Sequence, residues 1–88
     1  SRYGEGLAYE ENVEYLARYI EDIAKGIITN DKLQADLYAL AEYIRSKANV
    51  FKEEWIAKCY EYAYFIIENH YDEEMTRFCI QKIYETIG

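Results

Sequence analysis

The sequence predicts an all-α protein, a compact four-helix bundle whose helices run antiparallel in an up-down-up-down order. Three observations support this fold class. Apolar residues recur every three or four positions along most of the chain, which is the spacing of one helix face. The chain has no proline, the residue that most often interrupts helices. Its 88 residues provide one modest core, so residues 1–88 are expected to form a single domain.

The first helix is expected over about residues 8–25. Gly26 should end it in the left-handed conformation, and Ile27 should supply the apolar contact that often follows such an end. Residues 1–6 contain two of the glycines and are predicted to form a flexible arm. The apolar stripe of this helix consists of Tyr9, Val13, Leu16, Ile20 and Ile23.

The second helix is expected over about residues 31–47. Thr29, Asn30 and Asp31 are all residue types that cap helix N-termini, so the sequence leaves the capping residue open. The apolar stripe consists of Leu33, Leu37, Leu40, Ala41, Ile44 and Ala48.

The third helix is expected over about residues 50–69, although part of this segment resembles a strand. Tyr60, Tyr62 and Tyr64 alternate with other residues, and a period of two is typical of β-structure. The run without Gly or Pro is nevertheless much longer than the usual strand of about 5–6 residues. At about 100° per residue, one apolar face forms from Trp55, Ile56, Cys59, Tyr62, Ala63, Ile66 and Ile67.

The fourth helix is expected over about residues 72–87, with Asp72 as its N-cap. Glu73 and Glu74 fall in its first turn, where the helix dipole favours negative charge. Its apolar stripe consists of Met75, Cys79, Ile80, Ile83 and Ile87. The short links place consecutive helices antiparallel. An orthogonal array is the alternative, because the stripes are wider than a coiled-coil seam.

The charge of the chain argues against nucleic acid as a direct partner. The net charge is −7, and the basic residues are scattered, whereas phosphate contacts need clustered Lys and Arg. An acidic surface favours a basic protein partner, or serves only to keep the chain in solution. No apolar run approaches the roughly 18–20 residues that a membrane-spanning helix needs, so no membrane segment is expected.

Few residues are suited to catalysis, and we expect no enzyme, no cofactor and no metal site. The single histidine, His70, falls in the last turn of the third helix, where it can bind terminal carbonyls. Cys59 and Cys79 face the core and are expected to be free thiols in a reducing compartment such as the cytoplasm. A disulfide or a redox site is the alternative, and counting thiols under denaturing, non-reducing conditions would distinguish them.

Aromatic residues at the polar margins of the helices are the candidates for partner contacts. The chain contains 11 tyrosines, most of which fit the flanks of a helical core with the hydroxyl in water. Several aromatics instead project outward beside carboxylates, as in protein–protein contact surfaces. The alternative is that the third helix is central and surrounded. The candidates are Phe65, Tyr64, Tyr43, Glu61, Tyr15 and Phe78.

The function that best suits these features is a small acidic, non-enzymatic interaction module. It would dock on a larger, basic protein through exposed aromatics surrounded by carboxylates, as an inhibitor, an immunity-like protein or an accessory subunit. The alternative is a homodimeric structural protein whose aromatic faces bind each other. If Phe65 is exposed and the third helix is not central, Phe65→Ser should change the free energy of unfolding by less than about 1 kcal/mol, and a loss of about 3 kcal/mol or more would place Phe65 in the core.

Overall fold

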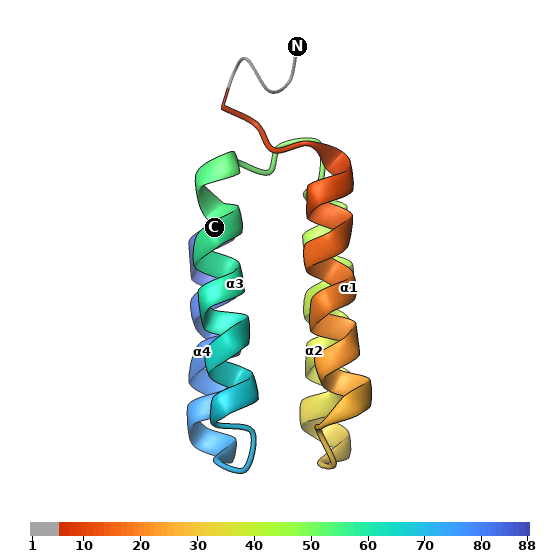
Figure 1. The fold of residues 1–88 in the computed structure, drawn as a ribbon, viewed down its shortest axis with the longest axis vertical. Helices are drawn as coiled ribbons and strands as arrows, with labels where there is room; N and C mark the ends of the chain where they lie inside the picture. The colour runs from red at the N-terminus through yellow and green to blue at the C-terminus, as the bar shows by residue number, and fades with distance from the viewer. Residues whose placement is uncertain (1–5) are drawn as a thin grey trace.

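The computed structural model describes residues 6–88, which form four helices. These are α1 (Glu10–Gly26), α2 (Asp31–Ser46), α3 (Glu53–Glu68) and α4 (Glu73–Ile87). They lie side by side and run alternately down and up (Figure 1), so the predicted four-helix bundle is confirmed and the orthogonal array is not adopted. Most of the predicted N-terminal arm, residues 1–5, lies outside the described residues.

The bundle consists of two helical hairpins packed against each other. α1 packs most extensively on α2, and α3 packs most extensively on α4. The hairpins meet through two smaller contacts, α1 against α3 and α2 against α4. Each of these pairs runs in the same direction, and α2 and α3 occupy diagonal corners (Figure 1). The link 47–52 therefore crosses the top of the bundle from one hairpin to the other.

The crossing link is held in place by Phe51. Its side chain is fully buried, and its ring packs edge-on against Trp55 with 5.2 Å between the ring centroids. The backbone of the link also binds the chain before α1. The N–H of Ala8 donates to the Phe51 carbonyl at 2.9 Å, and the N–H of Glu53 donates to the Gly6 carbonyl at 2.9 Å. These bonds join the starts of α1 and α3.

Two helix caps agree with the sequence, whereas one predicted helix end differs and α3 begins at Glu53, about three residues later than expected. Asn30 caps α2, its side chain accepting from the N–H groups of Lys32 and Leu33 at 2.9 and 3.1 Å. Asp72 caps α4 as predicted, accepting from the Met75 N–H at 3.0 Å. The predicted left-handed end at Gly26 is wrong, because Gly26 does not have a positive φ. The next residue, Ile27, has a φ of −131°, and its N–H donates to the Ile23 carbonyl. The regular helical hydrogen bonds therefore continue up to Ile27.

The first hairpin is held together by one arginine as well as by its core. The Arg45 guanidinium of α2 donates to both carboxylate oxygens of Glu14 on α1, each at 2.9 Å, and to Glu21 and Glu42. These hydrogen bonds from Arg45 hold the pKa of Glu14 at about 2, below its usual 4.5, although partial burial opposes the change. The pKa of Glu21 is lowered by the same guanidinium. The charges of Arg45, Glu14 and Glu21 thus join α1 to α2.

Candidate interaction surface

The structure distributes the six predicted contact residues over three different faces instead of gathering them. Three lie on the side formed by α3 and α4, two lie where α1 meets α3, and one lies between α2 and α4. In that order they are Phe65, Phe78 and Glu61, then Tyr15 and Tyr64, and finally Tyr43.

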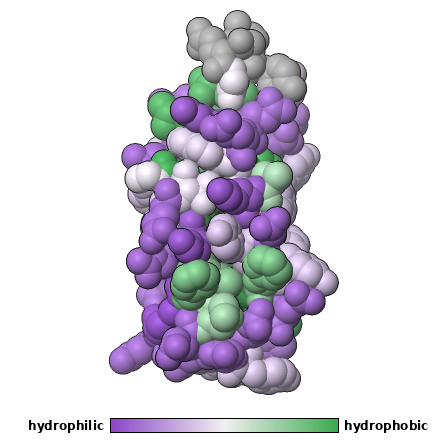
Figure 2. All heavy atoms as spheres, turned by 90° about the vertical axis from the view of Figure 1, so that its left-hand side faces the viewer, coloured by the Kyte–Doolittle hydropathy of each residue, from purple (hydrophilic) through white to green (hydrophobic). Residues whose placement is uncertain are grey.

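The α3/α4 face presents an apolar patch that consists of Phe65, Met75 and Phe78. Their side chains are 39%, 40% and 50% exposed. Tyr60 packs on Tyr19 of α1, so the side of α3 that carries Phe65 is the one turned away from α1 and toward α4. Figure 2 views this side of the molecule and shows a group of hydrophobic side chains in its lower half, near the turn between the two helices.

Met75 is the member of this patch that the sequence assigned to the core. It lies on the apolar stripe of α4, but in the first turn of that helix and on the edge nearest α3, where the bundle ends and no further layer covers it. The stripe alone could not reveal this exposure. The available signal was the position of Met75 in the turn that follows the N-cap, because side chains in a terminal turn have fewer neighbours than those in the middle of a helix.

Carboxylates surround the apolar patch. Glu61 and Glu68 on α3 and Glu74 and Glu85 on α4 are exposed on the same side of the bundle. One cation lies beside the patch: the Lys82 ammonium is 5.4 Å from the centroid of the Phe78 ring and 3.3 Å from a Glu85 carboxylate oxygen. The patch is therefore apolar at its centre and mainly negative at its edge.

A shallow groove continues from the patch toward the other end of the same face. It is lined by residues of the first half of α3 together with Glu85 and Thr86 of α4. The only tryptophan of the chain, Trp55, forms part of its wall and is half-buried. The α3 residues of the groove are Glu54, Trp55, Ala57, Lys58 and Glu61.

Tyr15 and Tyr64 are exposed on a different face, along the seam between α1 and α3. Their side chains are 53% and 52% exposed. Between them in height, Tyr19 and Tyr60 pack together with ring centroids 5.2 Å apart. Burial, followed by the nearby Tyr19, raises the pKa of Tyr60. This seam is a second aromatic surface, separate from the apolar patch.

The expected outward position of Tyr43 is wrong. Tyr43 is half-buried, its ring lies 5.0 Å from that of Tyr84 on α4, and its hydroxyl donates to the Gly88 carbonyl at 2.9 Å. The reason is that α4 lies along this edge of α2, and the stripe of a single helix does not reveal which flank a second neighbour covers. Tyr43 helps to join the two hairpins.

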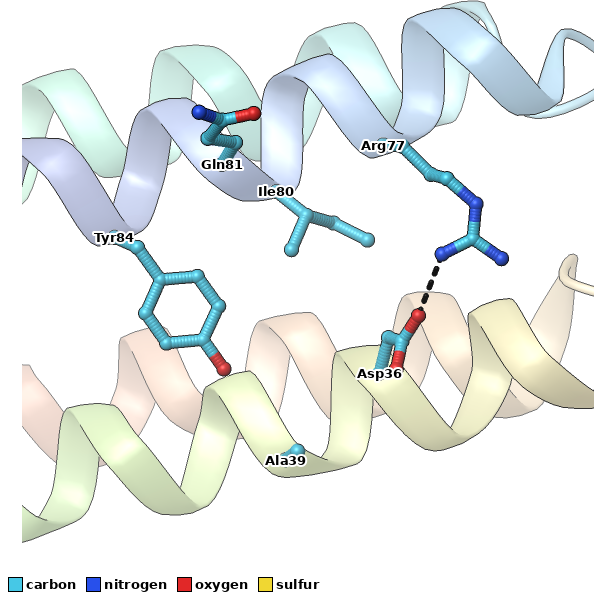
Figure 3. Close-up of a pocket in the computed structure, with 6 residues that line it drawn as sticks. All are labelled: Asp36, Ala39, Arg77, Ile80, Gln81 and Tyr84. Atoms are coloured by element: carbon cyan, nitrogen blue, oxygen red, sulfur yellow. Dashed lines mark hydrogen bonds and ion pairs between the residues drawn. The ribbon is translucent and has the colours of Figure 1, made fainter.

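A cleft of about 260 Å³ lies just below this contact, between α2 and α4 (Figure 3). Arg77 reaches across it to Asp36, with 2.7 Å between the guanidinium and the carboxylate, and also binds Glu73 at 3.1 Å. Ile80 and Tyr84 form its apolar side. The charged groups that line the cleft, Asp36 and Arg77, already pair with each other. They are therefore poorly suited to binding a small ligand.

The residues considered for catalysis occupy structural positions. The His70 Nδ1 lies 2.7 Å from the Ile67 carbonyl, as expected for a residue at a helix end. Cys59 and Cys79 are buried free thiols, and burial raises the pKa of Cys59 to about 12, which suppresses the reactive thiolate. Within residues 6–88, no cluster of three His, Cys, Asp or Glu side chains is arranged to hold a metal ion.

No helix in residues 6–88 has both the length and the apolar character needed to cross a bilayer. Comparison of the chain with protein-family models, curated proteins and solved structures finds no significant match.

Proposed function

We propose that this protein is a non-enzymatic interaction module that docks on a basic protein through its α3/α4 face. The observation that carries the proposal is the apolar patch itself: Phe65, Met75 and Phe78 are exposed on two adjacent helices and are surrounded by carboxylates. Interface centres are typically aromatic or contain Met, and are enclosed by a polar rim. Binding would bury the apolar patch and place basic groups opposite the glutamates.

Three further features support a protein partner. The net charge of −7 raises the association rate with a basic surface and opposes binding to nucleic acid. The patch lies on two helices that pack extensively on each other, so its shape is set before binding. The buried free thiols suit a reducing compartment such as the cytoplasm. Whether the protein acts as an inhibitor or as an accessory subunit would depend on which surface of the partner it covers.

The test is to capture partners of the tagged protein from its source cells, identify them, and measure binding to the purified partner by calorimetry. Phe65→Ser and Phe78→Ser should each weaken binding about tenfold or more, as interface hot spots do. The matched control is Tyr64→Ser, which removes an aromatic of similar exposure from the opposite flank of α3 and should leave the affinity unchanged. Raising the salt concentration should weaken binding, because exposed charges are screened.

Two results would contradict the proposal. One is an equal loss of affinity in Tyr64→Ser and in the two Phe variants. The other is recovery of only the protein itself, together with a dimer in light scattering at micromolar concentration. The second result would favour the homodimer, in which the apolar patches of two copies face each other.

A further inference from the structure

We propose that the element bound by the α3/α4 face is an amphipathic helix of the partner with basic flanks, lying along α3 and α4. This inference rests on the proposed function and adds the shape and chemistry of the docking segment. It follows from the arrangement of exposed residues along the face, from their charges, and from the hydrogen bonding of the two helices that form it.

The exposed residues of this face form two rows. On α3 they follow each other at alternating spacings of four and three, which keeps them on one side of a helix. The row on α4 has spacings of four and seven, which also keep it on one side of the helix, and the two helices pack closely and run antiparallel. The α3 row, at about 1.5 Å per residue, is some 20 Å long. The rows are Glu54, Lys58, Glu61, Phe65 and Glu68 on α3, and Glu74, Phe78 and Glu85 on α4.

A helix fits this surface better than an extended segment does. A docked strand needs unpaired backbone groups on its partner, whereas the main-chain groups along the middle of α3 and α4 bond within their own helices. A helix satisfies its own backbone and presents apolar side chains at i, i+3 or i+4 and i+7, which spans about 10 Å. That length lets one apolar stripe cover Phe65, Met75 and Phe78 while its next turns enter the groove beside Trp55.

The charges of the α3/α4 face indicate which residues should flank the apolar stripe of the docking helix. The two rows carry five glutamates, and the basic groups nearby are Lys58 and Lys82, the latter already bound to Glu85. Lys and Arg on both sides of the apolar stripe would face these carboxylates. The same carboxylates disfavour a second copy of this chain, which would bring identical charges, and an anionic membrane surface.

The probe is a synthetic helical peptide of about five turns, without Trp or Tyr, with leucines on one face and lysines on both flanks. Because Trp55 is the only tryptophan and lines the groove, its fluorescence reports on occupancy. The first control peptide has the same composition with the leucines spread around the helix. The second has glutamates in place of the lysines. Chemical-shift mapping of the same titration locates the bound peptide on the protein.

The patterned basic peptide should bind saturably and shift resonances of both rows. Each control peptide should bind at least about tenfold more weakly, as should the patterned peptide to Phe65→Ser, while Tyr64→Ser binds it normally. Equal affinity for the two lysine peptides, or shifts centred on Tyr15, would overturn the inference. If no peptide binds but capture of the natural partner still depends on Phe65, the helical docking segment is wrong and the proposed function stands. If neither peptide binding nor capture of the partner depends on Phe65, both the helical docking segment and the proposed function are wrong.

Discussion

The two hairpins of the bundle use their apolar residues differently. The large hydrophobic side chains exposed on α1 and α2 are limited to Tyr15, whereas α3 and α4 expose Phe65, Met75, Phe78 and Tyr64, and the turn between them exposes Tyr71. The buried residues show the converse. α1 buries six residues and α2 five, while α3 buries three and α4 five.

The charged residues differ in the same way. In the first hairpin Arg45 joins α1 to α2 by binding Glu14 and Glu21. In the second hairpin the ion pair at the apolar patch, Lys82 with Glu85, lies within α4, and the exposed glutamates of α3 point outward. We therefore expect the first hairpin to contribute more to stability, and we propose that the second provides the binding surface. Substitutions in the two hairpins should differ accordingly.

The largest effect is expected in the aliphatic core of the first hairpin. Leu37 is fully buried, so Leu37→Ala removes packed methyl groups and leaves a cavity. The free energy of unfolding, measured by urea denaturation, should fall by about 2–5 kcal/mol. A loss below about 1 kcal/mol would show that the first hairpin is not the stabilising half.

A smaller effect is expected from Arg45→Met, which removes the charge shared by α1 and α2. The Arg45 and Glu14 side chains are 28% and 36% exposed, so solvent screens their attraction, and we expect a loss of about 1–2 kcal/mol at neutral pH. The control is Arg18→Met. Arg18 also binds Glu14 but is 62% exposed, and its loss should cost less than about 0.5 kcal/mol.

The stabilisation by Arg45 should depend on pH in a defined direction. The pKa of Glu14 falls from its usual 4.5 to about 2 in the folded protein, mainly through its hydrogen bonds with Arg45. A lowered carboxylate pKa stabilises the fold fully above the usual pKa and progressively less as the pH falls toward the lowered one. The difference in unfolding free energy between wild type and Arg45→Met should therefore shrink between pH 4.5 and 2. A difference that stays constant over this range would contradict the assignment.

A still smaller effect is expected where the two hairpins meet. Tyr43→Phe keeps the ring contact with Tyr84 and removes the hydrogen bond to the Gly88 carbonyl. Because Gly88 is exposed to water, the free energy of unfolding should fall by only about 0.5 kcal/mol. The thermal midpoint of Tyr43→Phe and of Tyr15→Phe, a control on the other seam, would check this. Equal midpoints would show that this hydrogen bond does not contribute to stability.

The sequence predicted the four helices well because each has an apolar period without proline, and α2 and α4 also begin at capping residues, Asn30 and Asp72. It also predicted that Phe65 and Phe78 are exposed, since Phe65 lies on the polar side of its helix and Phe78 at the edge of its stripe. It could not place Tyr43 or Met75. The burial of Tyr43 depends on which flank of α2 is covered by α4, which follows from the diagonal crossing of the link 47–52 and is encoded in no single helix. Met75 is exposed because it lies in the first turn of α4, at the end of the bundle.

The central claim is that the apolar patch serves binding and not stability. The most direct test is to measure urea unfolding and partner affinity in the same Phe65→Ser/Phe78→Ser variant. We predict that each substitution changes the free energy of unfolding by less than about 1 kcal/mol, as at surface positions, while binding falls by about a hundredfold or more. A loss of about 3 kcal/mol or more per substitution, with weaker binding only in proportion to the unfolded fraction, would contradict the claim and place both rings in the core.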